Sequence, residues 1–248
     1  MKRYETVWKM RLVPRLPMVI RADGKAFHTL TRDMGRPFDA GFVEHMLHVA
    51  TTLCHEIDGV QVAYVQSDEI SVLVRDDQTL TTQPWFDKEL DKIVSVSAGI
   101  ASSEMSLRLG RRAVFDARAF VLPPGEVANY YVWRQQDATR NSVSMAAHAE
   151  LAKKLGADAS QALLHGKTWG EQQELLFAHC GVNWSEYPAH LKRGACIVPT
   201  TEQRPGRDGP VERRVWTADR DIPVFTQRRN YIEQFVSDNP KEANHAGI

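Results

Sequence analysis

Cysteine is scarce in this sequence, and there is no excess of charge of either sign. The 248 residues include three cysteines and no Cys-x-x-Cys pair, and Lys plus Arg equals Asp plus Glu at 31 each. An odd number of cysteines without metal-ligand spacing argues against a disulfide framework and a zinc site, and it fits buried thiols in a reducing compartment. A net charge of zero speaks neither for nor against a nucleic-acid partner, so only local clusters of charge could indicate one.

Long hydrophobic runs are also missing. No stretch approaches the ~18 apolar residues that would suggest a membrane-spanning helix, and the first ten residues, MKRYETVWKM, lack the apolar segment of a signal peptide. Hydrophobic residues make up 43% of the chain, which is enough for a core. We therefore expect a cytoplasmic protein without membrane contact, built as one large domain or as a domain with an appendage.

What is present is a regular alternation of strand and helix patterns. The predicted elements are a strand that ends at Asp23, a helix opened by Pro37 and Asp39, a hairpin over residues 62–74, a helix over 84–109, a strand over 111–123 and a helix over 126–155. This order is that of a ferredoxin-like split βαβ arrangement, in which helices cover one face of an antiparallel sheet. The pattern thus predicts an α+β fold.

The last hundred residues are less regular. They predict short helices at residues 159–164 and 170–180, strands at GACIVPT and ERRVWTA, and a mobile loop at TEQRPGRDGPV between those strands. We expect residues 1–155 to form the core and residues 156–248 to form an α/β appendage packed on it.

Two acidic residues end neighbouring strands of the predicted sheet. Asp23 follows the first strand, and Asp68 lies at the tip of the hairpin. Because these strands are neighbours in this arrangement, the two carboxylates can meet at one end of the sheet. Converging carboxylates suit Mg²⁺, and two Mg²⁺ ions about 4 Å apart can promote phosphoryl transfer. Gly24 would let the backbone approach a phosphate, and its carbonyl is a further candidate ligand.

These acidic residues also have ordinary structural explanations. Asp-Gly is a common turn dipeptide, and an acidic pair at a hairpin tip is usually solvated. Glu69, the second acid of the pair, is either a catalytic acid that supports the metal ligands or a surface charge. The occurrence of both sites at corresponding ends of adjacent strands is what favours function.

The segment DGKAFH, residues 23–28, offers further contacts for a phosphate. Consecutive backbone N–H groups after a glycine can form an anion-binding nest. Lys25 could pair with a phosphate or be a surface lysine, and His28 could contact a phosphate or pack beside the neighbouring ring. Ser67 could donate to a phosphate oxygen or satisfy the turn.

Three motifs, in this order, resemble those of the tRNA-histidine guanylyltransferase superfamily of 3′-to-5′ nucleotide polymerases. They are a D-G-[RK]-x-F-H segment at residues 23–28, a [KR]-P-F-D helix start at 36–39 and a Q-S-D-E-x-S hairpin at 66–71. Weaker similarity continues through LLHGKTWGEQQELLF, GVNW and LKRGACIV, so the resemblance spans most of the chain.

The resemblance implies a palm-like catalytic core that uses two Mg²⁺ ions and ATP or GTP. Asp23 and Asp68 would bind both ions, and the Gly24 carbonyl would bind one of them. The implied nucleotide-binding residues are Asp23, Gly24, Lys25, Ala26, Phe27, His28, Ser67 and Asp68. The enzyme would activate a tRNA 5′-monophosphate, which the 3′-hydroxyl of an incoming nucleotide would then attack. Members are typically dimers of dimers, so we expect a homotetramer.

One segment departs from the eukaryotic members of this superfamily. Those that add an untemplated G to histidine tRNA carry His-Ile-Asn-Asn in the helix after the fourth strand, whereas this chain reads VWRQQDATRNSVSMAAH at residues 132–148. This resembles the bacterial and archaeal "like proteins", which favour templated repair of 5′-truncated tRNAs.

Four basic residues and one asparagine, near this segment and near the C-terminal strands, are the candidate RNA contacts. They are Arg134, Arg140 and Asn141, together with Arg213 and Arg214. Such clusters could bind phosphates despite the zero net charge, or they could be solvated faces. Two other functions share the pattern: a palm-type nucleotide cyclase, which would not bind tRNA, and a non-catalytic RNA-binding protein, which would not need the acidic pair.

Overall fold

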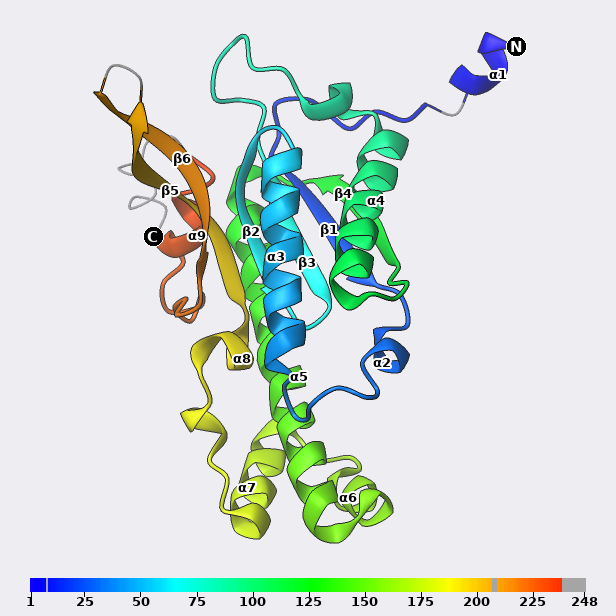
Figure 1. Ribbon diagram of the computed structural model, residues 1–248, viewed down its shortest axis with the longest axis vertical. Helices are drawn as coiled ribbons and strands as arrows, with labels where there is room; N and C mark the ends of the chain where they lie inside the picture. Colours follow the sequence, from blue (N-terminus) through cyan, green and yellow to red (C-terminus); the bar gives the residue numbers. More distant parts are fainter. Residues whose placement is uncertain (8, 207–208, 238–248) are drawn as a thin grey trace.

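The predicted order of elements is present in the computed structural model, which describes residues 1–7, 9–206 and 209–237 (Figure 1). The first part contains α1 (Lys2–Thr6), β1 (Met18–Gly24), α2 (Phe27–Leu30), α3 (Ala40–Glu56), β2 (Val60–Gln66), β3 (Glu69–Val74), η1 (Trp85–Lys88), α4 (Leu90–Leu109), β4 (Phe115–Val121) and α5 (Pro124–Leu155). The second contains α6 (Ala157–Leu164), α7 (Trp169–Cys180), η2 (Trp184–Glu186), α8 (Ala189–Arg193), β5 (Ala195–Gly206), β6 (Gly209–Asp219) and α9 (Asn230–Glu233).

The strands form one six-stranded sheet in the order β4-β1-β3-β2-β5-β6. Each neighbouring pair is antiparallel. The α+β class and the antiparallel sheet predicted from the sequence are therefore confirmed. Strand β3 lies inside the sheet, between β1 and β2, and all six of its residues are buried.

Helices cover both faces of this sheet, and here the prediction of helices on one face is wrong. Met18 and Ile20 of β1 pack with α3 and α4, while Val19, between them, packs with α5 on the other side. Figure 1 shows α3 and α4 in front of the sheet and α5 behind it. The physical signal was a continuous apolar run, Met18-Val19-Ile20, which marks a strand buried on both faces.

Local sequence chemistry explains where the main helices begin and end. The Asp39 carboxylate accepts a hydrogen bond from the Phe42 N–H at 2.8 Å and caps α3. Pro124 occupies the first turn of α5, where its missing N–H costs nothing. Gly110 ends α4 in the left-handed conformation. The predicted helix over residues 84–109 begins instead with the short η1 turn, followed by α4.

The C-terminal part is joined to the core through the sheet. Strand β5 pairs with β2, while α6 and α7 pack on the second half of α5 in a separate apolar cluster. In Figure 1, α6 and α7 lie at the lower end of α5, away from the sheet. The division at residue 155 into a core and an appendage stays a prediction.

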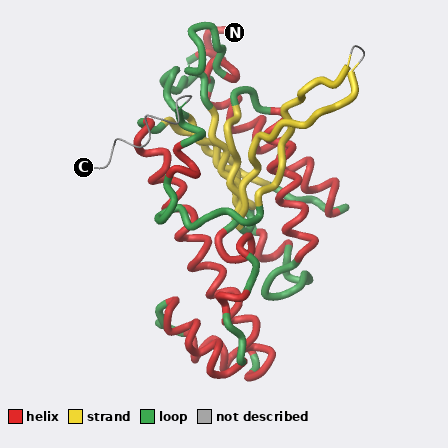
Figure 2. The backbone as a smooth tube through the Cα atoms, turned by 90° about the vertical axis from the view of Figure 1, so that its left-hand side faces the viewer, coloured by secondary structure: helices red, strands yellow, loops and turns green. Residues whose placement is uncertain are grey.

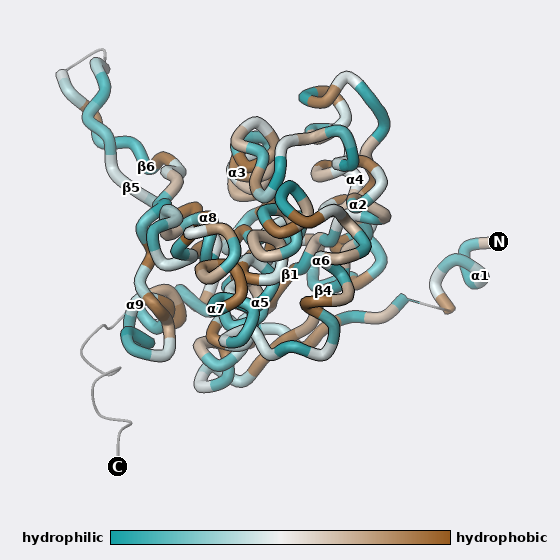
Figure 3. The backbone as a smooth tube through the Cα atoms, turned by 90° about the horizontal axis from the view of Figure 1, so that it is seen from below, coloured by the Kyte–Doolittle hydropathy of each residue, from teal (hydrophilic) through white to brown (hydrophobic). Residues whose placement is uncertain are grey.

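The predicted loop at residues 201–211 is wrong for the part that the structure describes, because β5 continues to Gly206 and β6 begins at Gly209. The two strands form a two-stranded arm that projects from the sheet and carries mainly hydrophilic residues (Figures 2 and 3). A ribbon that is exposed on both faces needs no alternation of apolar and polar residues, so the sequence carries no strand signal there. Within the described residues, no helix has both the length and the apolar character needed to cross a membrane.

Candidate active site

The ends of β1 and of the β2–β3 hairpin meet at one end of the sheet. The Gly24 N–H donates to the Asp68 carbonyl oxygen at 3.0 Å, and Asp23 lies directly opposite Glu69 in the strand register. The structure therefore brings Asp23, Gly24 and Asp68 together, as the spacing of the motifs predicts. Asp23 stands at the end of an internal strand, so its backbone is fixed on both sides by β3 and β4.

Electrostatics at this end of the sheet disfavour the charged form of Asp68. Burial raises the pKa of its carboxyl above the ordinary value, and the negative charge of Asp23 raises it further. Hydrogen bonds from its own backbone and from the Ser67 side chain act in the opposite direction. Two carboxylates held together at this cost are typical of a site that binds a cation.

The donor set fits Mg²⁺ rather than a transition metal. Asp23, Asp68 and the Gly24 carbonyl offer oxygen atoms, which Mg²⁺ prefers, and a magnesium site usually takes its remaining ligands from water and substrate phosphates. Among the described residues, no group of three His, Cys, Asp or Glu side chains is arranged to hold a metal ion.

The backbone after Gly24 is shaped by the packing of Phe27. A Cβ atom on Gly24 would lie 2.5 Å from the Phe27 ring, so a larger residue does not fit there. That ring is buried and meets Phe115 edge-to-face at 4.9 Å between centroids. In the chain between Gly24 and Phe27, Ala26 adopts the left-handed backbone conformation, with φ 58°. This turn leads into the short helix α2.

A cavity of about 300 Å³ opens beside this turn and the hairpin tip. Its walls come from α2 and the loop after it, the start of α3, the β2–β3 turn, the middle of α5, and α8. The residues predicted to bind a nucleotide or RNA that line it are Phe27, His28, Ser67, Asp68 and Asn141. A cavity that combines an apolar wall with a few polar groups and a carboxylate of raised pKa is the usual setting of a ligand site.

The backbone donors predicted for phosphate binding are partly engaged already. The Gly24 N–H is held by Asp68 and the Lys25 N–H donates to the Val114 carbonyl oxygen at 2.8 Å. Within residues 24–28, the backbone N–H groups that remain candidates for phosphate binding are therefore those of Ala26, Phe27 and His28. The side chain of Lys25 is exposed and can reach into solvent.

Glu69 lies in a buried network rather than on the surface. It is 7% exposed, and both of its carboxylate oxygens accept hydrogen bonds from the Arg134 guanidinium, at 2.8 and 3.0 Å. Gln66 donates to the same carboxylate at 3.0 Å. These contacts exclude the surface-charge alternative and leave the assignment of Glu69 as a catalytic acid a prediction.

The five predicted RNA contacts divide into one buried and four exposed residues. Arg134 is 7% exposed and turned toward Glu69, so its guanidinium is not presented to solvent. Arg140 and Asn141 lie on the exposed side of α5, and Arg213 and Arg214 lie exposed on β6. Of these, Arg214 donates to the Val60 carbonyl oxygen at 3.1 Å and stacks over Trp216.

Asp116 and Ser142 at the site were not found from the sequence. Asp116 of β4 lies directly opposite Asp23, and its side chain is 61% exposed. The far wall of the cavity includes Ser142 of α5 and Lys192 of α8, which are linked by a hydrogen bond from the Ser142 hydroxyl to the Lys192 carbonyl oxygen at 2.9 Å. No sequence motif contains both Ser142 and Lys192. They become neighbours only in the folded chain, where the pairing of β5 with the sheet places α8 beside α5.

Family models match nearly the whole chain. The model described as "tRNAHis guanylyltransferase" matches residues 1–123, and the one described as "Thg1 C terminal domain" matches residues 125–240. Among curated proteins, the "Probable tRNA(His) guanylyltransferase" of Drosophila melanogaster is 29% identical over 200 residues, which cover 75% of this chain and 68% of that protein.

Two solved structures resemble the whole chain closely. A bacterial tRNA(His) guanylyltransferase-like protein in complex with ATP has a TM-score of 0.84 and 36% identity, and the alignment covers 96% of this chain and 98% of that one. A bacterial tRNA(His) guanylyltransferase-like protein in complex with GTP has a TM-score of 0.77 and 37% identity, and the alignment covers 95% of this chain and 96% of that one. The chain therefore belongs to the tRNAHis guanylyltransferase family of nucleotidyltransferases.

Proposed function

We propose that this protein is a tRNA 5′-end nucleotidyltransferase that adds nucleotides in the 3′-to-5′ direction by two-metal phosphoryl transfer. The observation that carries the proposal is the meeting of Asp23, Gly24 and Asp68 beside a cavity lined by predicted nucleotide-binding residues. The bacterial relatives bound to ATP and to GTP support a nucleoside triphosphate as the ligand.

The chain's own residues would position three reacting groups. Asp23, Asp68 and the Gly24 carbonyl would hold two Mg²⁺ ions, which when bound neutralise phosphate charge and favour an ionised attacking oxygen. The N–H groups of Ala26 to His28, the Ser67 hydroxyl and the Lys25 ammonium would hold the triphosphate. Because the end of β1 is fixed, it would hold the bound triphosphate in a constant position relative to the attacking oxygen.

The reaction would take place in two steps, activation of the tRNA 5′ end and addition of the nucleotide. In the first, an oxygen of the tRNA 5′-monophosphate attacks the α-phosphorus of ATP or GTP, and pyrophosphate leaves with the electrons of the broken bond. In the second, the 3′-hydroxyl of the incoming nucleotide attacks the activated 5′ phosphate of the tRNA. That hydroxyl loses its proton, and the nucleoside monophosphate leaves.

The substrate we propose is a 5′-truncated tRNA repaired opposite a template base. The segment at residues 132–148 lacks His-Ile-Asn-Asn, and Arg140 and Asn141 stand in its place. The bacterial tRNA(His) guanylyltransferase-like proteins match at 36% and 37% identity over nearly the whole chain, which supports this choice. Arg140, Asn141, Arg213 and Arg214 are the proposed RNA contacts, and binding through phosphates would weaken steeply with salt.

One assay separates the possible outcomes. The protein is incubated with Mg²⁺, ATP, GTP and two 5′-monophosphorylated tRNAs, namely a histidine tRNA without its extra G and another tRNA without its first nucleotide. Templated extension of the truncated tRNA supports the repair function. Extension of the histidine tRNA alone would contradict it in favour of a dedicated guanylyltransferase.

Failure to extend either tRNA would overturn the proposed transfer reaction. Cyclic nucleotide formed from ATP or GTP would then identify a cyclase, and tRNA binding without Mg²⁺-dependent nucleotide binding would identify an RNA-binding protein. The homotetramer and the cytoplasmic location stay predictions. Sedimentation of the purified protein would test the first of these.

A further inference from the structure

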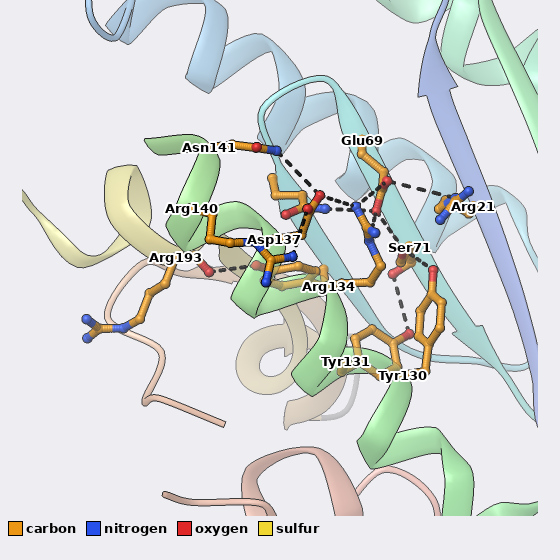
Figure 4. Close-up of polar contacts among 12 residues, drawn as sticks. Arg21, Glu69, Ser71, Tyr130, Tyr131, Arg134, Asp137, Arg140, Asn141 and Arg193 are labelled. Atoms are coloured by element: carbon orange, nitrogen blue, oxygen red, sulfur yellow. Dashed lines mark hydrogen bonds and ion pairs between the residues drawn. The ribbon is translucent and has the colours of Figure 1, made fainter. Parts of the chain in front are cut away.

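A buried polar network connects the hairpin that carries Asp68 to helix α5 (Figure 4). At its centre, the Glu69 carboxylate accepts hydrogen bonds from Gln66 and from two nitrogen atoms of Arg134. The Arg21 Nε lies 3.8 Å from the same carboxylate. The side chains of Glu69 and Arg134 are only 10% and 8% exposed, so this pair is shielded from water.

Arg134 extends the network toward the cavity. Its Nη2 also donates to the Asp137 carboxylate at 2.9 Å. Asp137 in turn accepts from Arg140 at 3.2 Å and from the Asn141 amide at 3.4 Å. Asn141 lines the cavity, whereas neither Arg134 nor Glu69 does. The Arg134 guanidinium therefore connects Glu69, the neighbour of Asp68, through Asp137 to Asn141 in the cavity wall.

We propose that Arg134 is a positioning residue, which locks the β2–β3 turn through Glu69 and so fixes Asp68 against Asp23. This inference rests on the proposed function, because it assigns Arg134 a role in presenting the proposed metal ligands. Arg134 contributes no contact of its own to the cavity, so it acts through its neighbours.

The geometry favours arginine for this task. A planar guanidinium matches a carboxylate in a bidentate pair, which fixes orientation as well as distance, and lysine cannot reproduce that pair. The turn needs such an anchor because Asp68 follows Ser67, which is held in the left-handed conformation with φ 48°. On the other side, Trp133 stacks on the Arg134 guanidinium, with 4.4 Å from the Cζ atom to the ring centroid.

The test compares removal of the charge with removal of the whole pair. The variants are Arg134→Met, Arg134→Lys, Glu69→Gln and the double variant E69Q/R134M. The matched control is Lys88→Met, because Lys88 and Asp76 form another buried ion pair, at 3.2 Å with both side chains 3% exposed. That pair lies past the far end of β3. Four quantities are measured: Tm, kcat and KM for tRNA extension, and amide hydrogen exchange of residues 64–74.

We expect Arg134→Met to lower kcat about 100-fold, the usual effect of a misplaced catalytic group, and to change KM for the nucleotide less than about threefold. Exchange at the turn should rise in the same variant. Arg134→Lys should recover Tm while losing roughly tenfold in kcat. Lys88→Met should lower Tm with kcat kept within about twofold, because it leaves an equally buried acid unpaired elsewhere.

The double variant separates positioning from stability. Replacing both buried charges removes the unpaired ion, so E69Q/R134M should regain most of the lost Tm. Its kcat should stay low and its turn should stay rapidly exchanging. Recovery of kcat together with Tm would reduce Arg134 to a stabilising role and overturn the proposal.

Two further results would also overturn the proposal. One is wild-type kcat and wild-type exchange at the turn in Arg134→Met. The other is a loss in Glu69→Gln far larger than in Arg134→Met, which would make Glu69 itself a catalytic residue. Failure of the proposed function has a different signature, since the wild-type protein would extend no tRNA. Exchange at the turn would still test the anchor in that case.

Discussion

Strand β3 has a buried ion pair near each of its ends, and the two pairs have different surroundings. Near one end, Glu69 pairs with Arg134 beside the exposed hairpin tip and the 300 Å³ cavity. Past the other end, Asp76 pairs with Lys88, whose ammonium also donates to the Leu16 carbonyl oxygen at 2.9 Å. Buried charge therefore does not identify a site by itself. The first end differs because it adds Asp23 and Asp68, two carboxylates close enough that the charge of Asp23 helps to raise the pKa of Asp68.

The largest expected difference between the two ends of β3 comes from removing one carboxylate at each end. Asp68→Ala, like Asp23→Ala, should lower nucleotide transfer by more than about 10³-fold, because the metal ligands would be incomplete, while the fold is kept. Asp76→Ala should cost about 3–5 kcal/mol of stability, because Lys88 would be left buried and unpaired, and should retain kcat. Extension assays and thermal unfolding of the variants give both quantities. Near-normal transfer in Asp68→Ala would contradict the metal assignment.

A glycine also lies near each end of β3. At Gly24 a Cβ atom would lie 2.5 Å from the Phe27 ring, and at Gly59, with φ +81°, it would lie 2.4 Å from the Arg75 carbonyl oxygen. Both Gly→Ala variants should therefore lose about 1–3 kcal/mol of stability.

Only Gly24→Ala should also reduce kcat, by roughly 10–100-fold, because it moves the turn that carries the triphosphate contacts. Denaturant unfolding and extension assays at a temperature where both variants are folded would measure this. An equal loss of kcat in Gly59→Ala would show that the effect is one of stability alone.

Lys25 should give a smaller effect that is confined to nucleotide binding. Its side chain is exposed beside the turn, so replacement by alanine removes one charge contact to a phosphate without disturbing the core. We expect KM for ATP to rise about 3–10-fold, as loss of a solvent-exposed charge contact worth about 1 kcal/mol predicts, with kcat nearly constant. Steady-state kinetics at varied ATP concentration would test this, and an unchanged KM would remove Lys25 from the site.

The smallest expected effect is a gain of stability in Asp68→Asn. Burial and the charge of Asp23 raise the pKa of Asp68 in the folded chain, so the folded state binds the proton more readily than the unfolded state. The ionised side chain therefore costs stability as pH rises above the ordinary carboxyl range. Without Mg²⁺ at pH 7, Asp68→Asn should raise Tm by a few degrees, about what 1 kcal/mol gives in a chain of this length.

That gain should shrink as pH falls toward and below the ordinary pKa of aspartate, because wild-type Asp68 is then protonated in both states. Thermal unfolding at pH 4 and pH 7 in the presence of a chelator would measure the difference. A Tm for Asp68→Asn that is lower than wild type at pH 7 would contradict the electrostatic cost that separates this end of β3 from the other.

Much of the candidate site could be predicted because its residues are local in sequence. The segment 23–28 and the hairpin tip each carry their chemistry within a few residues, and the strand order places the two segments side by side. The Glu69–Arg134 pair could not be predicted, because its partners lie 65 residues apart on a strand and a helix. From the sequence, Arg134 was one of the candidate RNA contacts, because a basic residue in a polar segment gives no sign of the acid that it will pair with.

By itself, the sequence determined the order of strands and helices, the N-terminal cap of α3 and the placement of two carboxylates at strand ends, because these depend on periodicity and short-range hydrogen bonding. Only the tertiary structure decided that α5 covers the second face of the sheet, that α8 lines the cavity, and that Glu69 forms a buried ion pair with Arg134. The physical reason is that these features depend on long-range packing and charge burial. Neighbouring residues along the chain do not fix either of them.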